Sequence, residues 1–429
     1  MTRSEWRGWL LVAAFSLVLF LITAGTYNAL GVVLPHMVSE EGWSWTEAGF
    51  GFTLLGAATG ASSFLPQMLI RKVGVRATLL IGTAVMALGF LALARTQGVW
   101  LYFIGAALCG VGYQMMALIP GTHVLAALFK HRALPFGIYF TSAALGGVAG
   151  PFVVFAVLAL SHGHWRDFWL LQMVGAIVVG VLCAAVVGSD AALARDSART
   201  DAELAEETAR RPSPRVWRTR VDWTTRAALA TPQFYVLLAC YFGHLLIGVT
   251  VASVSVAHLT QRGVSATVAG TMLAIEALMQ MAGRTIGGFV GDLIDPRWLL
   301  IVALASLIVG AGALSVASAW PMMILYAVGS GVGFGLTLLA VSVLLLNYFG
   351  RKHNLEIFAL TCLIGAVSAF GPTVAGAIRD ATGSFGIAFQ LFAGVIAVIL
   401  VAVLLMRPPL PGVTMPEAEA AARLAEDAA

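Results

Sequence analysis

Residues 129–151 read FKHRALPFGIYFTSAALGGVAGP, and residues 349–372 follow the same plan as FGRKHNLEIFALTCLIGAVSAFGP. Each stretch begins with an aromatic residue and basic side chains, continues as an apolar run rich in small residues, and ends in Gly-Pro. The basic cluster at 71–76 has its counterpart at 292–297, at nearly the same distance along the chain. The sequence therefore contains two copies of one long unit.

The composition around these copies is that of a membrane protein. The 429 residues are 59% hydrophobic and only 11% charged, with a mean hydropathy of +0.90, whereas about a quarter of a soluble domain is charged. Because a helix needs about 20 apolar residues to cross a bilayer, the chain has room for about twelve spans. We predict an all-α integral membrane protein with 12 transmembrane helices in two six-helix halves related by pseudo-two-fold symmetry.

The expected spans fall in two groups on either side of a polar segment. They cover residues 9–35, 46–70, 77–95, 99–128, 134–160, 168–188, 232–259, 266–291, 298–318, 321–349, 355–378 and 386–406. We accordingly expect an N-terminal half at 1–188, a cytoplasmic linker at 189–230, a C-terminal half at 231–406 and a cytoplasmic tail at 407–429. The N-terminus lacks a small-residue cleavage site, so the first run is expected to be a span and not a removed signal peptide.

The basic residues predict the orientation in the membrane. The sequence holds 25 Lys and Arg residues, and in this assignment all but five lie in the termini and in loops of one side. The exceptions are Arg95, Arg166, Arg262 and Arg379 in loops of the other side, and Arg284 within a span. Cytoplasmic loops carry the excess of Lys and Arg, so both termini should face the cytoplasm. The net charge of +4 is then a topology signal and does not indicate a nucleic-acid partner.

Motifs for catalysis or metal binding are missing from the sequence. It has no Gly-rich phosphate loop before a Lys, no HExxH and no CxxC. Cys109, Cys183, Cys240 and Cys362 all lie in apolar runs without a pairing pattern. We expect no enzyme, no cofactor and no metal, and a gradient as the energy source of any transport.

The signature around the fifth span resembles that of a known family. Leu128 to Gly137, continued by Gly146, Gly147 and Gly150, is similar to the fifth-helix signature of the monocarboxylate transporters of the major facilitator superfamily, and to related bacterial anion exchangers such as the oxalate:formate antiporter. Three further segments look like family positions: residues 41–45, Trp165-Arg166 and residues 379–383. In the facilitator loop motif at 67–76, Arg71 stands where an Asp is usual, while the second copy keeps Asp292.

This resemblance implies a bacterial inner-membrane transporter that works as a monomer. In major facilitator transporters the substrate site lies near the midplane between the halves, and we expect the first, fourth, seventh and tenth helices to line it. The implied partners are a small carboxylate substrate, protons and the lipid bilayer.

Arg284 is the first candidate for substrate binding. It lies eight residues before Asp292, which places it about 12 Å from the cytoplasmic end of its helix. An Arg at this depth costs about 2.5 to 3.5 kcal/mol on insertion scales, so it should face a cavity or a partner. Its planar fork suits a carboxylate, and the family has a substrate-binding Arg at the matching position. The alternative is an Arg bound to Glu276 or to backbone carbonyls.

Glu276 and Gln280 precede Arg284 at helical spacing and form a polar stripe with it. A carboxyl group in low-dielectric surroundings is a candidate proton carrier, so Glu276 is either a proton site or a structural partner. The family's acidic residue lies one turn before the Arg, where this chain has Gln280. His244 in the seventh span is a second proton candidate, with hydrogen-bonded packing as its alternative.

The remaining candidates line the expected cavity or its cytoplasmic mouth. The family's Lys in helix 1 is absent, and Tyr27 and Asn28 fall near its position. Leu145, Phe358, Cys362 and Tyr113 could form an apolar wall for a short carbon tail, or ordinary helix packing. Gate contacts or topology signals are expected from the residues at cytoplasmic helix ends: Arg71, Lys72, Arg76, Lys130, Arg132, Asp292, Arg297, Arg351 and Lys352.

We therefore predict a secondary active transporter of small monocarboxylates of the lactate and pyruvate type, working by proton symport and alternating access. One alternative is an organic-anion exchanger of the oxalate:formate type. Such an exchanger looks to use a second basic residue in the eleventh helix, and none occurs between His353 and Arg379. The other alternative is a non-transporting membrane sensor, which no signalling motif supports.

Overall fold

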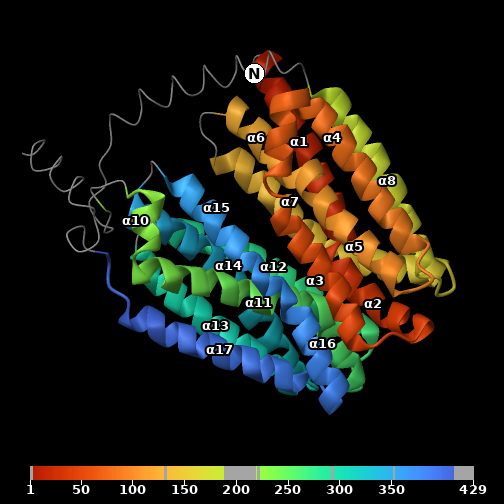
Figure 1. Cartoon of the computed structure of the whole chain (residues 1–429). Coiled ribbons are helices and arrows are strands. Elements are labelled where there is room, and N and C mark those ends of the chain that lie inside the picture. Colours follow the sequence, from red (N-terminus) through yellow and green to blue (C-terminus); the bar gives the residue numbers. More distant parts are fainter. Residues whose placement is uncertain are drawn as a thin grey trace, which may run out of the picture.

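The structure is a computed structural model that describes residues 3–129, 133–187, 219, 223–290, 294–350 and 353–409. Within these ranges the secondary structure is entirely helical. Of the expected linker at 189–230, only Thr219 and residues 223–230 are described, and the expected tail is described only as far as residue 409. Figure 1 shows two groups of long helices that lean against each other.

The first group holds the helices of the N-terminal part. Its elements are α1 (Arg3–Gly25), α2 (Tyr27–Glu41), α3 (Trp45–Ala61), α4 (Leu65–Ala94), α5 (Val99–Tyr113), the π-helix η1 (Gln114–Leu118), α6 (Ile119–Leu128), α7 (Ala133–Leu160) and α8 (Arg166–Val186). The first span is thus divided into α1 and α2 at Thr26, and the fourth span is divided by a π-helical turn. Such turns are often found at functional sites.

The second group holds the C-terminal helices. Its elements are α10 (Thr225–Leu229), α11 (Pro232–Gln261), α12 (Ala266–Val290), α13 (Pro296–Val316), α14 (Trp320–Phe349), α15 (Asn354–Gly365), the 3-10 helix η2 (Ala366–Phe370), α16 (Gly371–Thr382) and α17 (Gly386–Leu405). The repeated Gly-Pro therefore differs between the halves: Pro151 lies inside the continuous helix α7, whereas Pro372 lies in the first turn of α16.

Eleven helices among the described residues are long and apolar enough to cross a membrane. The expected second span, at 46–70, is not among them because it is divided between α3 and the first part of α4. After α3 the chain continues into the first part of α4, which then changes direction at Gly74, where φ is +84°. A Gly tolerates this left-handed conformation at no steric cost. Residues 45–73 thus form one broken crossing, which accounts for the twelfth expected span.

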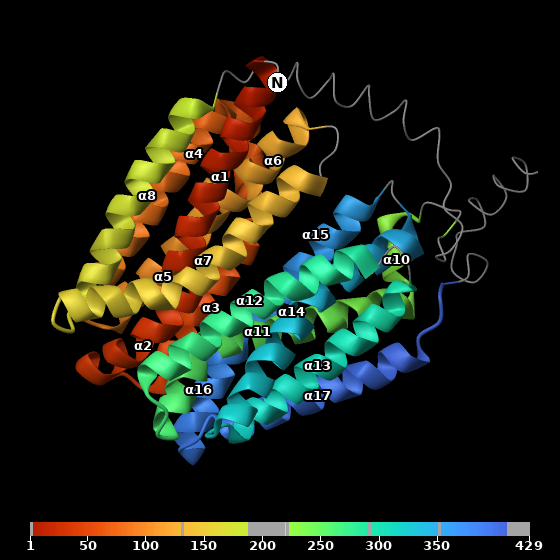
Figure 2. The same cartoon turned by 180° about the vertical axis from the view of Figure 1, so that it is seen from behind.

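The two groups touch at one end of the molecule and separate toward the other. In Figures 1 and 2, α3 lies against α16, whereas α6 and α15 diverge. At the same end, α2 packs against α11. The close approach at the first end depends on two glycines, because a β-carbon on Gly49 would collide with the backbone of Pro372 and one on Gly376 with the backbone of Trp45. We call this region, where α3 meets α16, the closed end.

Asp380 of α16 binds the N-terminus of α3 at the closed end. Its carboxylate accepts hydrogen bonds from the backbone N–H groups of Trp45 at 3.2 Å and Thr46 at 2.9 Å, and from the Thr46 hydroxyl at 2.6 Å. A negative charge is favourable at a helix N-terminus. Deeper in the same interface, the Thr53 hydroxyl lies 2.6 Å from the carbonyl of Ala369. These polar contacts hold the halves together.

The three minor motif segments of the sequence meet at this end. Arg166 forms ion pairs with Glu40 and Glu41, and the neighbouring Trp165 donates its indole N–H to Glu40 at 2.6 Å. The guanidinium of Arg379 lies 5.8 Å from the ring of Trp45. Residues 41–45 therefore contact both of the other segments, which explains why charged and aromatic side chains stand at helix ends that are far apart in sequence.

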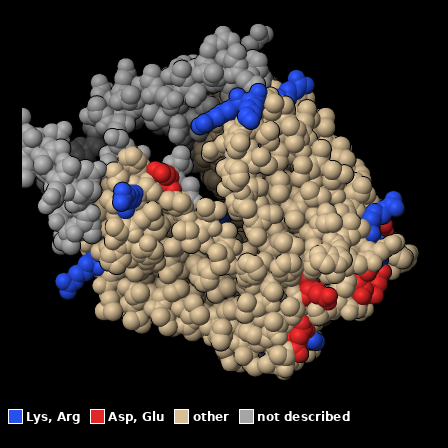
Figure 3. Space-filling view, in the orientation of Figure 1, with Lys and Arg blue, Asp and Glu red and all other residues tan. Residues whose placement is uncertain are grey.

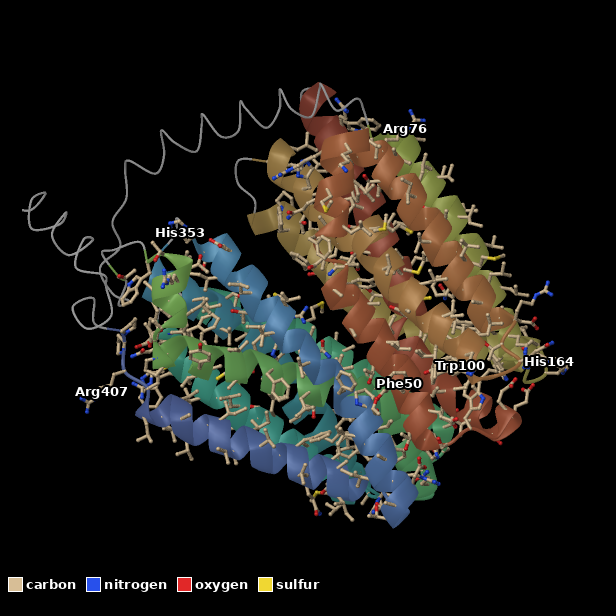
Figure 4. The ribbon with its side chains drawn as sticks, in the orientation of Figure 1. Phe50, Arg76, Trp100, His164, His353 and Arg407 are labelled. Carbon is tan, nitrogen blue, oxygen red and sulfur yellow. The ribbon has the colours of Figure 1, made fainter. Side chains whose placement is uncertain are left out.

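Charged side chains lie at the two ends of the molecule in Figure 3, with a broad uncharged belt between them. The same view shows the surface hollowed between the two helix groups. In Figure 4, Arg76, His353 and Arg407 lie toward the end where the groups diverge, whereas Trp100 and His164 lie at the opposite end. This distribution fits a protein whose middle is surrounded by lipid.

Replacing Asp380 with Ala should loosen the closed end. The variant loses three hydrogen bonds between the halves, and a change of 1 to 2 kcal/mol alters a two-state ratio by about 5-fold to 30-fold. We expect Thr53→Cys, introduced after replacement of the four native cysteines, to react at least about fivefold faster with an impermeant maleimide in the Asp380→Ala background.

Glu47→Ala is the matched control for this experiment. Glu47 accepts hydrogen bonds from the backbone N–H and hydroxyl of Ser44 within the same helix end, so its loss weakens the α3 cap without touching the other half. Equal labelling rates in the Asp380→Ala and Glu47→Ala backgrounds would contradict a role of Asp380 between the halves.

Candidate functional site

A cavity of about 660 Å³ lies between the two halves. Residues of α7 form its wall on the N-terminal side, and residues of α12 and α14 form the wall on the C-terminal side. The tenth span, α14, thus lines the cavity as expected, while the fifth and eighth spans supply the rest. Both sides include apolar side chains, among them Phe136 and Phe140 on α7 and Leu338 and Leu339 on α14.

Arg284 of α12 is the charged side chain in the described lining of this cavity. Its Nε–H has no hydrogen-bond partner in the structure. Its guanidinium carbon lies 5.8 Å from the centre of the Phe334 ring, on α14. A cation over an aromatic face gains a modest attraction, but this does not satisfy the donors of a guanidinium. The guanidinium thus keeps a buried, unpartnered Nε–H beside the cavity that Arg284 lines.

Glu276 and Gln280 form a pair of their own, one to two turns away from Arg284. The Gln280 amide donates to both carboxylate oxygens of Glu276, at 2.8 and 2.9 Å, and Glu276 is 2% exposed. Because four residues advance a helix by about 400°, each step of four rotates the stripe by about 40°. Arg284 therefore faces the cavity while Glu276 is enclosed by protein, and no ion pair between the two is present in the described part of the chain.

Aromatic and polar side chains from three other helices surround Arg284. Its charge interacts electrostatically with Tyr113 at the end of α5 and with His244 on α11. His244 is 1% exposed, its Nδ1 has no hydrogen-bond partner, and its ring lies 4.9 Å from the rings of Tyr241 and Phe334. The seventh span thus reaches the site through His244.

Tyr27 and Asn28 stand at the break in the first span and have different surroundings. The Tyr27 hydroxyl is 3.0 Å from the hydroxyl of Thr59, and its ring packs edge-on against Tyr113 at 5.8 Å. Asn28 donates to the carbonyl of Gly147 at 3.1 Å. Tyr27 therefore lies next to the aromatic group near Arg284, whereas the Asn28 amide ties α2 to α7.

The four expected wall residues are distributed over three helices: Tyr113 lies on α5, Leu145 on α7, and Phe358 and Cys362 on α15. The ring of Phe358 lies 6.2 Å from that of Tyr241, and Cys362 interacts electrostatically with the same tyrosine. Both residues therefore lie next to the cluster that His244 forms with Tyr241 and Phe334. Leu145 on α7 is 45% exposed.

Four of the expected gate residues can be placed: three flank the break of α4 at Gly74 and one lies at the start of α13. Arg71, Lys72 and Arg76 are exposed on α4. Arg297, at the start of α13, donates to the carbonyls of Val403 at 3.1 Å and of Leu404 at the C-terminus of α17, where a cation is favourable. Lys130, Arg132, Asp292, Arg351 and Lys352 lie outside the described residues.

The sequence reasoning missed Phe334 and most of the apolar lining. Met281 and Gly288 stand three residues before and four residues after Arg284, so helical periodicity could have placed them on the same face. Phe334 comes from α14, and its approach to Arg284 depends on how two helices pack. Among the described residues, no group of three His, Cys, Asp or Glu side chains could hold a metal ion.

Comparison with known proteins identifies the family. The model of the Major Facilitator Superfamily matches residues 15–262 and 237–426, and the chain belongs to this superfamily. The protein is a multi-pass membrane protein and a secondary transporter, not an enzyme. The predicted all-helical fold in two halves is confirmed.

Distant relatives are also transporters. The chain is 24% identical over 409 residues to the aspyridones efflux protein apdF of Emericella nidulans, covering 85% of this chain and 77% of the relative. It is 26% identical over 295 residues to the uncharacterized transporter ESBP6 of Saccharomyces cerevisiae, covering 66% of this chain but only 41% of the yeast protein.

Solved structures share the fold at low sequence identity. A D-xylose-proton symporter superimposes with a TM-score of 0.72 at 14% identity, covering 95% of this chain and 98% of the symporter. The nucleoside transporter NupG gives a TM-score of 0.69 at 13% identity, covering 92% of this chain and 99% of NupG.

Replacing Gln280 with Leu should destabilise the protein through Glu276. The variant leaves a buried carboxylate without its amide donor, which costs about 1 to 3 kcal/mol and more for a charged group. We expect a lower melting temperature of the purified protein in detergent, with a smaller loss at acidic pH because a protonated carboxyl group is less costly to bury.

The double variant Glu276→Leu/Gln280→Leu serves as the control in a double-mutant cycle. It removes both partners and should recover much of the lost stability. If the two single changes lower the melting temperature additively, the hydrogen-bonded pair does not contribute to stability.

Proposed function

We propose that this transporter carries small monocarboxylates of the lactate and pyruvate type across the inner membrane by proton symport. The observation that supports this most directly is Arg284, which lines a cavity between the halves and whose buried Nε–H has no hydrogen-bond partner. Two parallel N–H donors bind a carboxylate with defined geometry. The resemblance of the fifth-span signature to monocarboxylate transporters points to the same substrate class.

A single carboxylate is favoured over two. Arg284 is the basic residue of the described cavity lining, and the eleventh span has no Lys or Arg between His353 and Arg379. A dicarboxylate would bring a second negative charge into an apolar cavity without a partner, which is costly. Monocarboxylate transport is therefore the better supported function, and exchange of oxalate with formate is the less supported one.

Glu276 is the proposed proton site. It is a carboxyl group buried within α12, on the helix that carries the substrate Arg. Gln280 lies between Glu276 and Arg284 along the helix, so a proton on Glu276 and an anion on Arg284 would be about two turns of one helix apart. With both ligands bound, Arg284, Glu276 and their ligands carry no net charge, as in the empty site, whereas either ligand alone would leave a net charge inside the membrane. This is the physical reason for coupling them.

The direction of opening follows from the charge distribution. By the positive-inside rule the end marked by Arg76 and Arg407 would face the cytoplasm, together with both termini. The closed end at Asp380 would then face outward, and the structure would be open to the cytoplasm. The efflux role in the name of the Emericella nidulans relative makes export the second candidate direction.

Uptake of labelled L-lactate into proteoliposomes tests the proposal. An inward proton gradient should drive accumulation that a protonophore abolishes, and short monocarboxylates should compete. Uptake that occurs only when another acid is preloaded inside would support exchange in place of symport. No uptake and no competition by any short acid would overturn the proposal.

Replacing Arg284 with Gln should abolish carboxylate binding and transport while leaving the fold intact. The guanidinium has no hydrogen bond at Nε to lose, and removing a buried charge lowers the cost of insertion. We expect unchanged expression and melting temperature, and uptake reduced at least about 100-fold, a loss of about 2.8 kcal/mol.

Arg284→Lys is the conservative comparison. A Lys keeps the charge but lacks the planar fork, so it should retain weak binding with a raised KM. If Arg284→Gln kept the affinity of the native protein, Arg284 would not belong to the substrate site.

Replacing Glu276 with Gln should separate transport from proton coupling. The substitution keeps a hydrogen-bonding side chain of the same size next to Gln280 but cannot carry a proton. We expect counterflow exchange of labelled substrate to persist and accumulation driven by a pH gradient to disappear. Unchanged pH dependence of accumulation would remove Glu276 from the coupling mechanism.

A further inference from the structure

The walls of the cavity around Arg284 are predominantly apolar. Six apolar side chains surround the space, namely Phe136, Phe140, Ala144, Met281, Leu338 and Leu339. They come from both halves of the protein and from three helices. A ligand held at Arg284 therefore meets hydrocarbon on both sides of its carboxylate.

The polar side chains of the lining offer little to a second polar group. The Thr285 hydroxyl donates to the carbonyl of Met281 at 2.9 Å, and the Ser342 hydroxyl donates to that of Leu338 at 2.7 Å. Both donors are thus used within their own helices, as is common for Ser and Thr in transmembrane helices. Thr141 on α7 is the third hydroxyl of the lining, so a ligand beyond its carboxylate meets one open hydroxyl in a wall that is otherwise apolar or internally hydrogen-bonded.

The volume is large for a small acid. The cavity measures about 660 Å³, within the range of about 300 to 1,000 Å³ that holds drug-sized ligands. An acid with six heavy atoms fills a small part of it and leaves most of the apolar wall in contact with water. An acid with a longer hydrocarbon tail would displace that water and gain from the burial.

We propose that the preferred substrates are amphipathic monocarboxylic acids, with the carboxylate on Arg284 and an apolar tail between the aromatic wall of α7 and the leucines of α14. This inference rests on the proposed monocarboxylate transport and extends it to larger acids. Each buried methylene should raise the affinity about threefold to fourfold, until the tail outgrows the cavity.

Two glycines of the lining provide the means to test the tail site. Gly137 on α7 and Gly288 on α12 both line the cavity, and a β-carbon at either position would meet no atom within 4 Å. Gly137→Leu and Gly288→Leu would therefore fill the cavity from opposite walls without displacing neighbouring groups. Leu also has a higher helix propensity than Gly, so both variants should fold.

Gly394→Leu is the matched control. Gly394 lies on α17 and likewise has no atom within 4 Å of a β-carbon, but it is not part of the cavity lining. The same change of side chain is thus made at a helix surface away from the proposed site.

The experiment measures the affinity of the purified full-length protein for butyrate, hexanoate and octanoate. Hexanamide is the uncharged counterpart of hexanoate, and the Arg284→Gln variant identifies the binding that depends on the carboxylate. We expect affinity to increase about threefold to fourfold per methylene in the native protein and in Gly394→Leu. Gly137→Leu and Gly288→Leu should lose at least about tenfold for octanoate and less than about twofold for butyrate.

The outcomes separate this inference from the proposed function. Affinities that depend on Arg284 but do not change with chain length would overturn the tail site and leave monocarboxylate transport intact. A chain-length effect that is equal in all three Gly variants, or an affinity for hexanamide equal to that for hexanoate, would show partition into detergent or lipid and would also overturn it. Absence of any Arg284-dependent binding of an acid would overturn both proposals.

Discussion

Arg284 places a positive charge inside a bundle of apolar helices, and the arrangement around it depends on how that charge is stabilised. An Arg at mid-membrane costs about 2.5 to 3.5 kcal/mol on insertion scales, so it persists where a cavity or an opposite charge compensates it. Here the Glu276 carboxylate accepts its hydrogen bonds from Gln280, and Phe334 offers Arg284 only a weak cation–π contact. Glu276 acts on the Arg284 charge only electrostatically, and in the proposed function an anion in the cavity supplies the closer partner.

Alternating access adds a second requirement, since the halves must bind each other firmly yet separate. Backbone approaches at Gly49 and Gly376 bring α3 and α16 together at the closed end, and Asp380 holds them through hydrogen bonds to a helix N-terminus. Hydrogen bonds of this kind contribute a modest net free energy because water can replace them. The closed end is thus stable enough to form and weak enough to open.

The proposed substrate path combines two kinds of recognition that act on different parts of one molecule. The guanidinium of Arg284 recognises a charge with defined geometry, whereas the apolar walls of α7 and α14 recognise size and hydrophobicity without direction. In such a site the charged group fixes the orientation of the ligand, and the length of its tail sets how much apolar surface is buried. In this proposal the charge is recognised from α12, and the apolar tail is recognised mainly by α7 and α14.

The sequence by itself determined the membrane location, the two repeated halves and the polar stripe from Glu276 to Arg284, because hydropathy, charge bias and helical spacing are properties of the chain read in order. It also marked residues 41–45, Trp165-Arg166 and 379–383 as motifs. Only the tertiary structure decided that these motifs meet. It also decided that the Gln280 amide donates to Glu276 and does not line the cavity, and that Phe334 and the aromatic side chains of α7 lie on the same side as Arg284. Such contacts depend on the packing of helices far apart in sequence, and helical periodicity specifies the face a residue shares but not which helix lies opposite it.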